Sequence, residues 1–466
     1  MRNSLPTAAI HIIDDDSLLN VFYLYRPFLL GEDDDDEDHH LFGGEGGWDR
    51  GRWWYKLAHV CQRWRNVVLG SASYLGVSLV CTNGTPVADM LAHSPHLPLV
   101  IDYYLDEDED ITAEDEEGSI LALKQYDRVR RVRLRMPATS LHKLIVTMDD
   151  EYPILEYLII FHATEDKSLI SHFPETLQAP HLRHLLLFGF TFPIGSRLLT
   201  TAADLVTLGL FMIHPSTYFH LNTLLQWLSF MPQLETLCIR FDFPVPDRDV
   251  ERQLTHALNP PLNTIPASLP NIQVLRFSGI TPYFEALFHW TTAPHLKSLE
   301  LELFNQLTYS VPRLRHFVNI TENLRFQSAK LEFNNEQFVA GMYPHEDAKM
   351  YALRIIVNCY HLDWQVSSAT QIFNSLGPMF SAVEHLTVEH EEHSLSSEEH
   401  NEADTTEWRK LLGSFSNVKT LRIEKGLVKE LSRCLKSDDG ELPFEQQELS
   451  SESGKTGDAF TTFVRT

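Results

Sequence analysis

The sequence predicts an α/β fold in which a short helical module precedes a long, irregular repeat solenoid of parallel strands and helices. Three observations predict it. A short apolar pattern recurs between residues 128 and 425, amphipathic helical segments lie between its copies, and a separate helical pattern precedes residue 80. Strands that alternate with helices are typical of parallel sheets. We therefore expect five regions: a flexible N-terminus (1–9), a helical module (10–80), a connector (81–127), a solenoid (128–436) and a polar, disordered tail (437–466).

The recurring pattern is a Pro or a small residue followed by apolar-x-x-apolar-x-apolar. It has eight clear copies and two weaker ones, at residues 153–160, 180–188, 203–211, 232–241, 270–278, 294–303, 381–390 and 416–425, then 128–136 and 328–333. The first apolar residues Leu155, Leu182, Leu205 and Leu234 are 27, 23 and 29 residues apart. Each copy predicts a short strand whose inward leucines need a neighbouring repeat to cover them. The wider spacings after Leu234 indicate insertions.

Helix-like segments lie between these strands, at residues 220–230, 283–290 and 406–415. In the first of them, Leu221, Leu224, Leu225 and Leu228 share one face at i, i+3, i+4 and i+7. The pattern and its spacing resemble the irregular leucine-rich repeats over roughly residues 128–425. The Asn that this family places a few residues after the last Leu is absent here, so the resemblance implies irregular turns.

Residues 10–80 carry a different pattern. Acidic residues typical of a helix N-terminus precede Leu18, Leu19 and Phe22, which share one helical face. A second helix is expected over Trp53–Val68, and a third apolar element over residues 70–80. Three short apolar-faced elements make a marginal core by themselves. We therefore expect the module to gain stability by packing against a partner or against the solenoid.

The module resembles an F-box over about seventy residues, and its Val-Cys-x-x-Trp-Arg stretch is the most distinctive part. The matching positions are Asp15, Asp16, Leu18, Leu19, Val21, Phe22, Val60, Cys61, Trp64, Arg65 and Leu75. Two features depart from the family: Ile13-Asp14 replaces the usual Leu-Pro, and an acidic, Gly-rich insertion at residues 31–51 suits a protruding loop.

The resemblance implies a non-catalytic substrate-recognition subunit of an SCF-type (Skp–cullin–F-box) ubiquitin ligase. The module would bind a Skp-type adaptor and, through it, a cullin, while the repeats bind a target protein. The expected adaptor-binding residues are Leu18, Leu19, Phe22, Val60, Cys61 and Trp64. The alternative is a leucine-rich-repeat scaffold without a ubiquitin ligase, in which these helices only cap the solenoid. The two differ in whether Leu19 and Trp64 are exposed or buried against the first repeat.

Strand alternation also predicts a target-binding surface. The third, fifth and seventh positions of each copy face away from the leucine core, and the early copies place apolar side chains there. We expect Leu186, Phe188 and Phe211 to form an apolar anchor, with Arg240 and Arg276 farther along the same surface. The open alternative is that the N-terminal module or loop residues cover this patch.

Charge and composition narrow the function classes. The net charge of −26 disfavours binding to nucleic acid, because phosphates would be repelled. Much of this charge lies in acidic runs, and we expect the run at residues 102–117 to be a solvated loop. Five scattered cysteines, the absence of a signal peptide and the absence of a long apolar stretch favour the cytoplasm or nucleus, without a membrane. No segment has both the residue types and the spacing of a catalytic, metal-binding or cofactor-binding motif, so we do not expect an enzyme.

Overall fold

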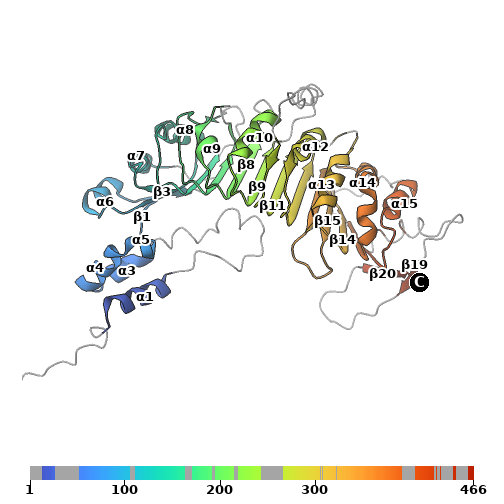
Figure 1. Ribbon diagram of the computed structural model, residues 1–466, viewed down its shortest axis with the longest axis horizontal. Helices are drawn as coiled ribbons and strands as arrows, with labels where there is room; N and C mark the ends of the chain where they lie inside the picture. The colour runs from blue at the N-terminus through green and yellow to red at the C-terminus, as the bar shows by residue number, and fades with distance from the viewer. Residues whose placement is uncertain are drawn as a thin grey trace, which may run out of the picture. The chain divides into compact units, whose positions relative to one another are not determined.

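The computed structural model describes residues 13–26, 52–104, 111–162, 171–191, 195–214, 219–242, 266–304, 306, 308–321, 323–390, 405–424, 427, 431, 444–447 and 460–465. Mostly parallel strands alternate with helices, so the predicted α/β class is confirmed (Figure 1). The chain divides into two compact units. The first comprises residues 1–187 and 195–202, and the second comprises residues 188–194 and 203–466.

In the first unit, five strands follow one another in the order β1 (Leu79–Cys81), β2 (Leu99–Tyr104), β3 (Val129–Met136), β4 (Tyr157–His162) and β6 (His184–Phe188). The connecting helices are α6 (Val87–His93), α7 (Ala113–Leu123) and α8 (Ala138–Thr147); β5 (Ser171–His172) and α9 (Arg197–Thr201) complete the unit. Each helix carries the chain back so that the next strand pairs in parallel. Ile101, Leu134 and Leu158 are fully buried on the inner face of three successive strands.

The predictions of a connector over residues 81–127 and of an acidic loop over residues 102–117 are wrong, because this region forms two further strand–helix units. Asp102 lies in β2, where Arg133 of β3 donates to both of its carboxylate oxygens at 2.8 and 3.1 Å. Asp115 lies in the first turn of α7 and accepts from the Thr112 hydroxyl at 2.8 Å. These carboxylates have partners within the fold, so an acidic run does not by itself predict a solvated loop. Residues 105–110 lie outside the described residues.

The second unit begins with β7 (Phe190–Thr191) and continues with the parallel neighbours β8 (Thr207–Ile213), β9 (Thr236–Phe241), β11 (Val274–Gly279) and β13 (Ser298–Leu303). The short strands β10 (Ala267–Ser268) and β12 (Thr291–Thr292) pair separately. Helices α10 (Leu221–Ser229), α12 (Thr281–Trp290), α13 (Pro312–Ile320), α14 (Leu362–Leu376) and α15 (Thr405–Gly413) contact one another in this sequence along one face of the strands (Figure 1). Within residues 128–425, all ten predicted strands and all three helices predicted between them are present.

The wide spacing between residues 296 and 383 is where the parallel order is interrupted. After β13 the chain forms β14 (Ser328–Phe333), β15 (Gln337–Tyr343) and β16 (Leu353–Asn358), and the sheet order is β13–β16–β15–β14–β17. Strand β15 is antiparallel to both of its neighbours. Helix α14 and the 3-10 helix Gly377–Ala382 then lead to β17 (His385–His390), which pairs with β14 in parallel. The insertion is therefore part of the sheet.

The C-terminal strands also extend the sheet. Strand β18 (Thr420–Glu424) pairs with β17 in parallel and with β20 (Phe460–Arg465) in antiparallel fashion, and β19 (Phe444–Gln447) pairs with β20. The prediction of a disordered tail over residues 437–466 is therefore wrong for these two strands. The N-terminal segment 1–9 and the predicted insertion 31–51 lie outside the described residues.

The Asp102–Arg133 pair offers a stability test. Both residues are buried, with 8% and 9% of their surface exposed. An Arg133→Met substitution leaves the carboxylate buried without its cationic partner, so the free energy of unfolding should fall by about 3–5 kcal/mol. The double substitution Asp102→Leu with Arg133→Met should recover most of that loss. Chemical denaturation of the full chain measures both; a single variant no less stable than the double variant would contradict this account.

Candidate functional site

The helices before β1 form a small module with its own core. Helix α1 (Asp15–Tyr25) begins after Asp14, whose carboxylate accepts from the Ser17 backbone N–H at 2.7 Å. This contact lowers the pKa of Asp14 below its usual value. On the inner side of α1, Leu18 and Phe22 are each 1% exposed. The Phe22 ring packs edge-on against Trp64 with 4.8 Å between ring centroids.

The predicted single helix over Trp53–Val68 is instead two helices, α3 (Trp53–Ala58) and α4 (Gln62–Gly70). The break lies at Cys61, whose backbone is extended. Two arginines of α4 hold the pieces together: Arg65 donates to the Ala58 carbonyl at 3.1 Å, and Arg63 pairs with Asp15 of α1 at 2.7 Å. The short helix α5 (Ala72–Leu75) follows and ends at Gly76, whose φ of +65° suits glycine.

The module is joined to the first strand by a buried tryptophan. The indole N–H of Trp54 donates to the Ser78 carbonyl at 2.9 Å, directly before β1, and the side chain is 4% exposed. Leu75 and Val77 on the same connection are 0% and 1% exposed. A buried indole whose N–H is hydrogen-bonded contributes buried apolar area, and the hydrogen bond also fixes the orientation of the ring. The module is therefore packed onto the fold through α3 and α5.

Part of the exposed surface of the module is apolar. Of the sixteen large apolar side chains that are exposed in the described part of the chain, seven lie between residues 13 and 74: Ile13, Val21, Tyr23, Leu24, Tyr25, Val60 and Tyr74. Leu24 is 80% exposed. Val21, Leu24 and Tyr25 share one side of α1 at i, i+3 and i+4. An apolar helix side that water contacts is typical of a surface that binds a partner.

The six predicted adaptor-binding residues divide into core and surface. Leu18 and Phe22 are buried inside the module, so they hold α1 against α4 and are not available at the surface. Val60 is 58% exposed, while Leu19, Cys61 and Trp64 are half-buried. The exposed residues Leu24 and Tyr25 were not in the predicted set, although their spacing from Val21 in the sequence indicates a second apolar side of the helix.

The prediction of an exposed target-binding anchor is wrong. Leu186, Phe211 and Arg276 are only 1%, 4% and 7% exposed, and Phe188 and Arg240 are half-buried. In the second unit these outward side chains contact one another across strands. Phe188 stacks on Phe211 at 4.3 Å between centroids, and the Arg240 guanidinium lies 6.0 Å from the Phe211 ring centre. Strand alternation predicts the face on which a side chain lies, but it does not predict whether that face is covered.

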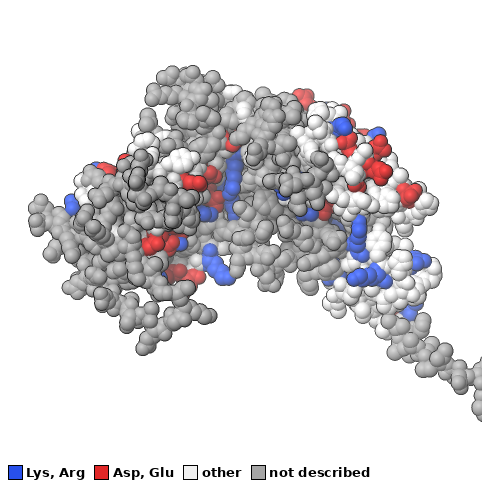
Figure 2. Space-filling model, turned by 180° about the vertical axis from the view of Figure 1, so that it is seen from behind, with Lys and Arg blue, Asp and Glu red and all other residues white. Residues whose placement is uncertain are grey.

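A buried carboxylate organises the charged part of this face. Glu300 of β13 is 4% exposed and accepts from Arg240 at 3.0 Å and from the Tyr351 hydroxyl. Arg276 and Arg354 lie 3.9 and 3.7 Å from the same carboxylate. On the face drawn in Figure 2, some basic side chains lie next to acidic ones, whereas those at the lower right gather without an acidic neighbour in view. The arginines therefore serve first to neutralise a buried acid.

The comparisons with known proteins assign no family. No family model matches the sequence, and no curated protein is similar to it. Within the described ranges, no helix is both long and apolar enough to cross a bilayer, and no three His, Cys, Asp or Glu side chains are grouped as metal ligands.

The division into core and surface predicts different effects of truncation. Phe22→Ala should lower the free energy of unfolding by about 3–5 kcal/mol, because it removes a buried ring from a small core. Leu24→Ala should change it by less than about 0.5 kcal/mol, because that side chain already contacts water. Chemical denaturation of the two full-length variants checks this; equal losses of stability would contradict it.

His184 predicts a pH dependence of stability. Its ring stacks on Tyr157 at 4.4 Å between centroids. Burial, with help from Arg183 and Arg131, lowers the pKa of His184 from 6.5 to about 4. The folded state resists protonation of His184. The contribution of the neutral His184 ring to stability is therefore present above pH 6.5 and is lost as the pH falls toward 4. His184→Gln should flatten the pH dependence of denaturation in this range; an unchanged pH profile would contradict the assignment.

Proposed function

We propose that this protein is a non-catalytic substrate receptor of an SCF-type ubiquitin ligase, and that its N-terminal module docks a Skp-type adaptor and, through it, a cullin. The supporting observation is the exposed apolar surface of α1, together with Tyr74, whose ring lies 5.3 Å from that of Tyr23, and the exposed Val60 of the same module. Each leucine-sized side chain that becomes fully buried contributes about 1.5–3 kcal/mol. Leu24 alone therefore offers a substantial contribution to docking.

The sequence pattern supports the same proposal. Leu18, Leu19 and Phe22, followed by the Val-Cys-x-x-Trp-Arg stretch, resemble an F-box, and the following strand pattern resembles leucine-rich repeats. In such a receptor the module supplies binding while the transfer chemistry belongs to other subunits. A target held beside a charged conjugating enzyme has a high effective concentration of lysines there.

The alternative is a repeat scaffold in which the helices only cap the end of the sheet. A terminal cap needs a polar outer face for solubility. The outer side of α1 instead carries Val21, Leu24 and Tyr25, all at least half exposed. Trp64 packs on Phe22 within the module. This distribution favours a docking function over a capping function.

We expect Leu24→Asp to weaken binding to a purified Skp-type adaptor. A charge at the centre of an apolar contact must be desolvated on binding, so the affinity should fall by at least about tenfold. Val146→Asp is the matched control, because Val146 is an apolar residue of α8 that is 59% exposed. Co-purification and titration of both full-length variants measure the difference.

Three outcomes are informative. Loss of binding for Leu24→Asp alone supports the module as the docking surface. Equal binding by the unsubstituted protein and both variants places the adaptor contact elsewhere. The absence of any binding by the unsubstituted protein contradicts the proposed function and leaves the scaffold alternative.

A further inference from the structure

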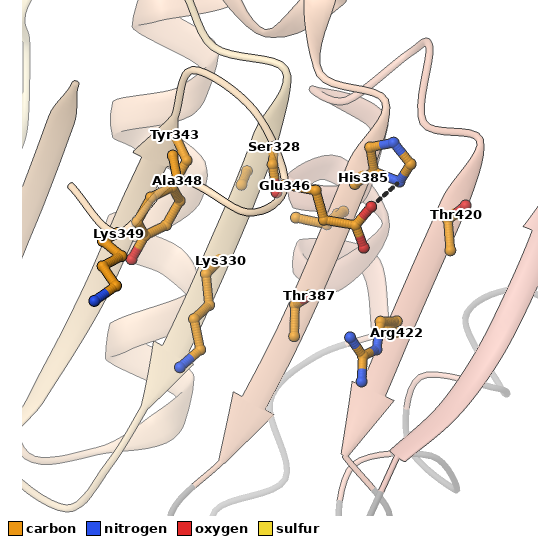
Figure 3. A pocket seen from close by; sticks show the side chains of 12 residues that line it. Ser328, Lys330, Tyr343, Glu346, Ala348, Lys349, His385, Thr387, Thr420 and Arg422 are labelled. Carbon is orange, nitrogen blue, oxygen red and sulfur yellow. Dashed lines mark ion pairs between the residues drawn. The ribbon is translucent and has the colours of Figure 1, made fainter. Parts of the chain in front are cut away.

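The polar cavity between β14, β15, β17 and β18 in the second unit contains charges that are already paired. Lys330 contacts Glu332 at 2.6 Å and Glu389 at 2.9 Å. Glu346, on the loop that crosses the start of these strands, lies 3.7 Å from His385 (Figure 3). Charges that are paired within the fold are weak attractors for a ligand. The opposite end of this part of the sheet, where β16 ends and α14 begins, is different.

Aromatic side chains are exposed at this end of the sheet. Tyr360 and Trp364 are 73% and 55% exposed, and no Phe, Tyr or Trp in the described part of the chain is more exposed than these two. His361, which is also exposed, lies edge-on to Trp364 with 5.3 Å between ring centroids. Tryptophan and tyrosine are the side chains that most often dominate the binding energy of protein interfaces. Their exposure here therefore indicates a binding surface.

Hydrogen bonds hold this surface in place before any partner binds. Gln365 of α14 is 1% exposed, and its side-chain amide donates to the Cys359 carbonyl and to the Asn334 carbonyl, each at 2.7 Å. The first bond fixes the loop that carries Tyr360. The second fixes the turn between β14 and β15 against the start of α14. A surface that is ordered beforehand loses less conformational entropy when it binds.

The same surface is acidic. Glu302 of β13 accepts from Asn358, at the end of β16, at 2.9 Å, Glu336 is exposed in the turn between β14 and β15, and Asp363 lies in the first turn of α14. None of these three carboxylates has an ion-pair partner among the described residues. The segments that form this surface contain no Lys or Arg: residues 302–309, 333–337 and 357–364. Its negative charge is therefore not neutralised locally.

We propose that this surface binds a basic peptide segment of a partner protein, with a Lys or Arg side chain of that segment against the Trp364 ring. A cation is attracted to the face of an indole, and the aliphatic part of a long basic side chain packs well on apolar surface. Glu336 and Glu302 supply the opposite charge. A nucleic acid or an anionic membrane would be repelled by these carboxylates. A second copy of this chain, with its net charge of −26, would be repelled as well.

The test is a titration of the full-length protein with a short fluorescein-labelled peptide of alternating Arg, Lys and Gly, measured by fluorescence anisotropy. Trp364→Ala should weaken binding by at least about tenfold, because the aromatic contact is lost. Glu336→Gln should weaken it about threefold and reduce its dependence on salt, because one exposed charge is removed. Tyr126→Ala and Glu117→Gln are the matched controls, since both residues are exposed in the first unit, and they should bind like the unsubstituted protein.

Trp364 and Glu336 are exposed, so neither substitution should change chemical denaturation of the protein. Absence of peptide binding overturns the proposal. Equal binding by all variants also overturns it, because the net negative charge alone then attracts the peptide. Self-association of the unsubstituted protein that Trp364→Ala abolishes identifies a second copy as the occupant and likewise overturns it. The Skp-type adaptor takes no part in this measurement, so its outcome is independent of the proposed ubiquitin-ligase function.

Discussion

The structure depends on one constraint: the inward leucines of each strand must be covered by the next strand and helix. Leu208, Leu237, Leu275 and Leu299 are at most 2% exposed, although each strand contributes only a few residues to the core. A single strand–helix unit cannot bury its own apolar face, so stability comes from its neighbours. The same constraint explains the hairpin at β15 and β16, which joins the sheet although it reverses the strand direction.

The same need to bury apolar residues divides the N-terminal module into a buried inner side and an exposed outer side. Its inner side is fixed to the start of the first strand through Trp54 and Ser78, and its core is closed by Leu18 and Phe22. These contacts leave Leu24 and Tyr25 of α1 exposed. A helix that only capped one end of the sheet would gain no stability from apolar residues on its exposed side. The buried apolar residues of α1 thus stabilise the module, whereas its exposed apolar residues need a separate explanation.

The strand pattern could be predicted from the sequence because each copy repeats the same local alternation. The structure places a strand at every copy, including the weak ones at β3 and β14. The acidic region was predicted wrongly because Asp102 finds its partner, Arg133, thirty-one residues away. The target-binding patch failed for a similar reason: nothing local in the sequence tells whether Phe211 is covered. The exposed surface at Trp364 could not be foreseen either, because it depends on which strands become neighbours across an insertion.

We propose that the exposed side of the N-terminal helices is the adaptor-binding surface. Hydrogen–deuterium exchange of the full chain, with and without a purified Skp-type adaptor, tests it most directly. Adaptor binding should slow exchange in peptides that cover residues 15–25 and 60–75, with no change in peptides that cover β14 and β18. Unchanged exchange in the module, or protection confined to the strands, would contradict it.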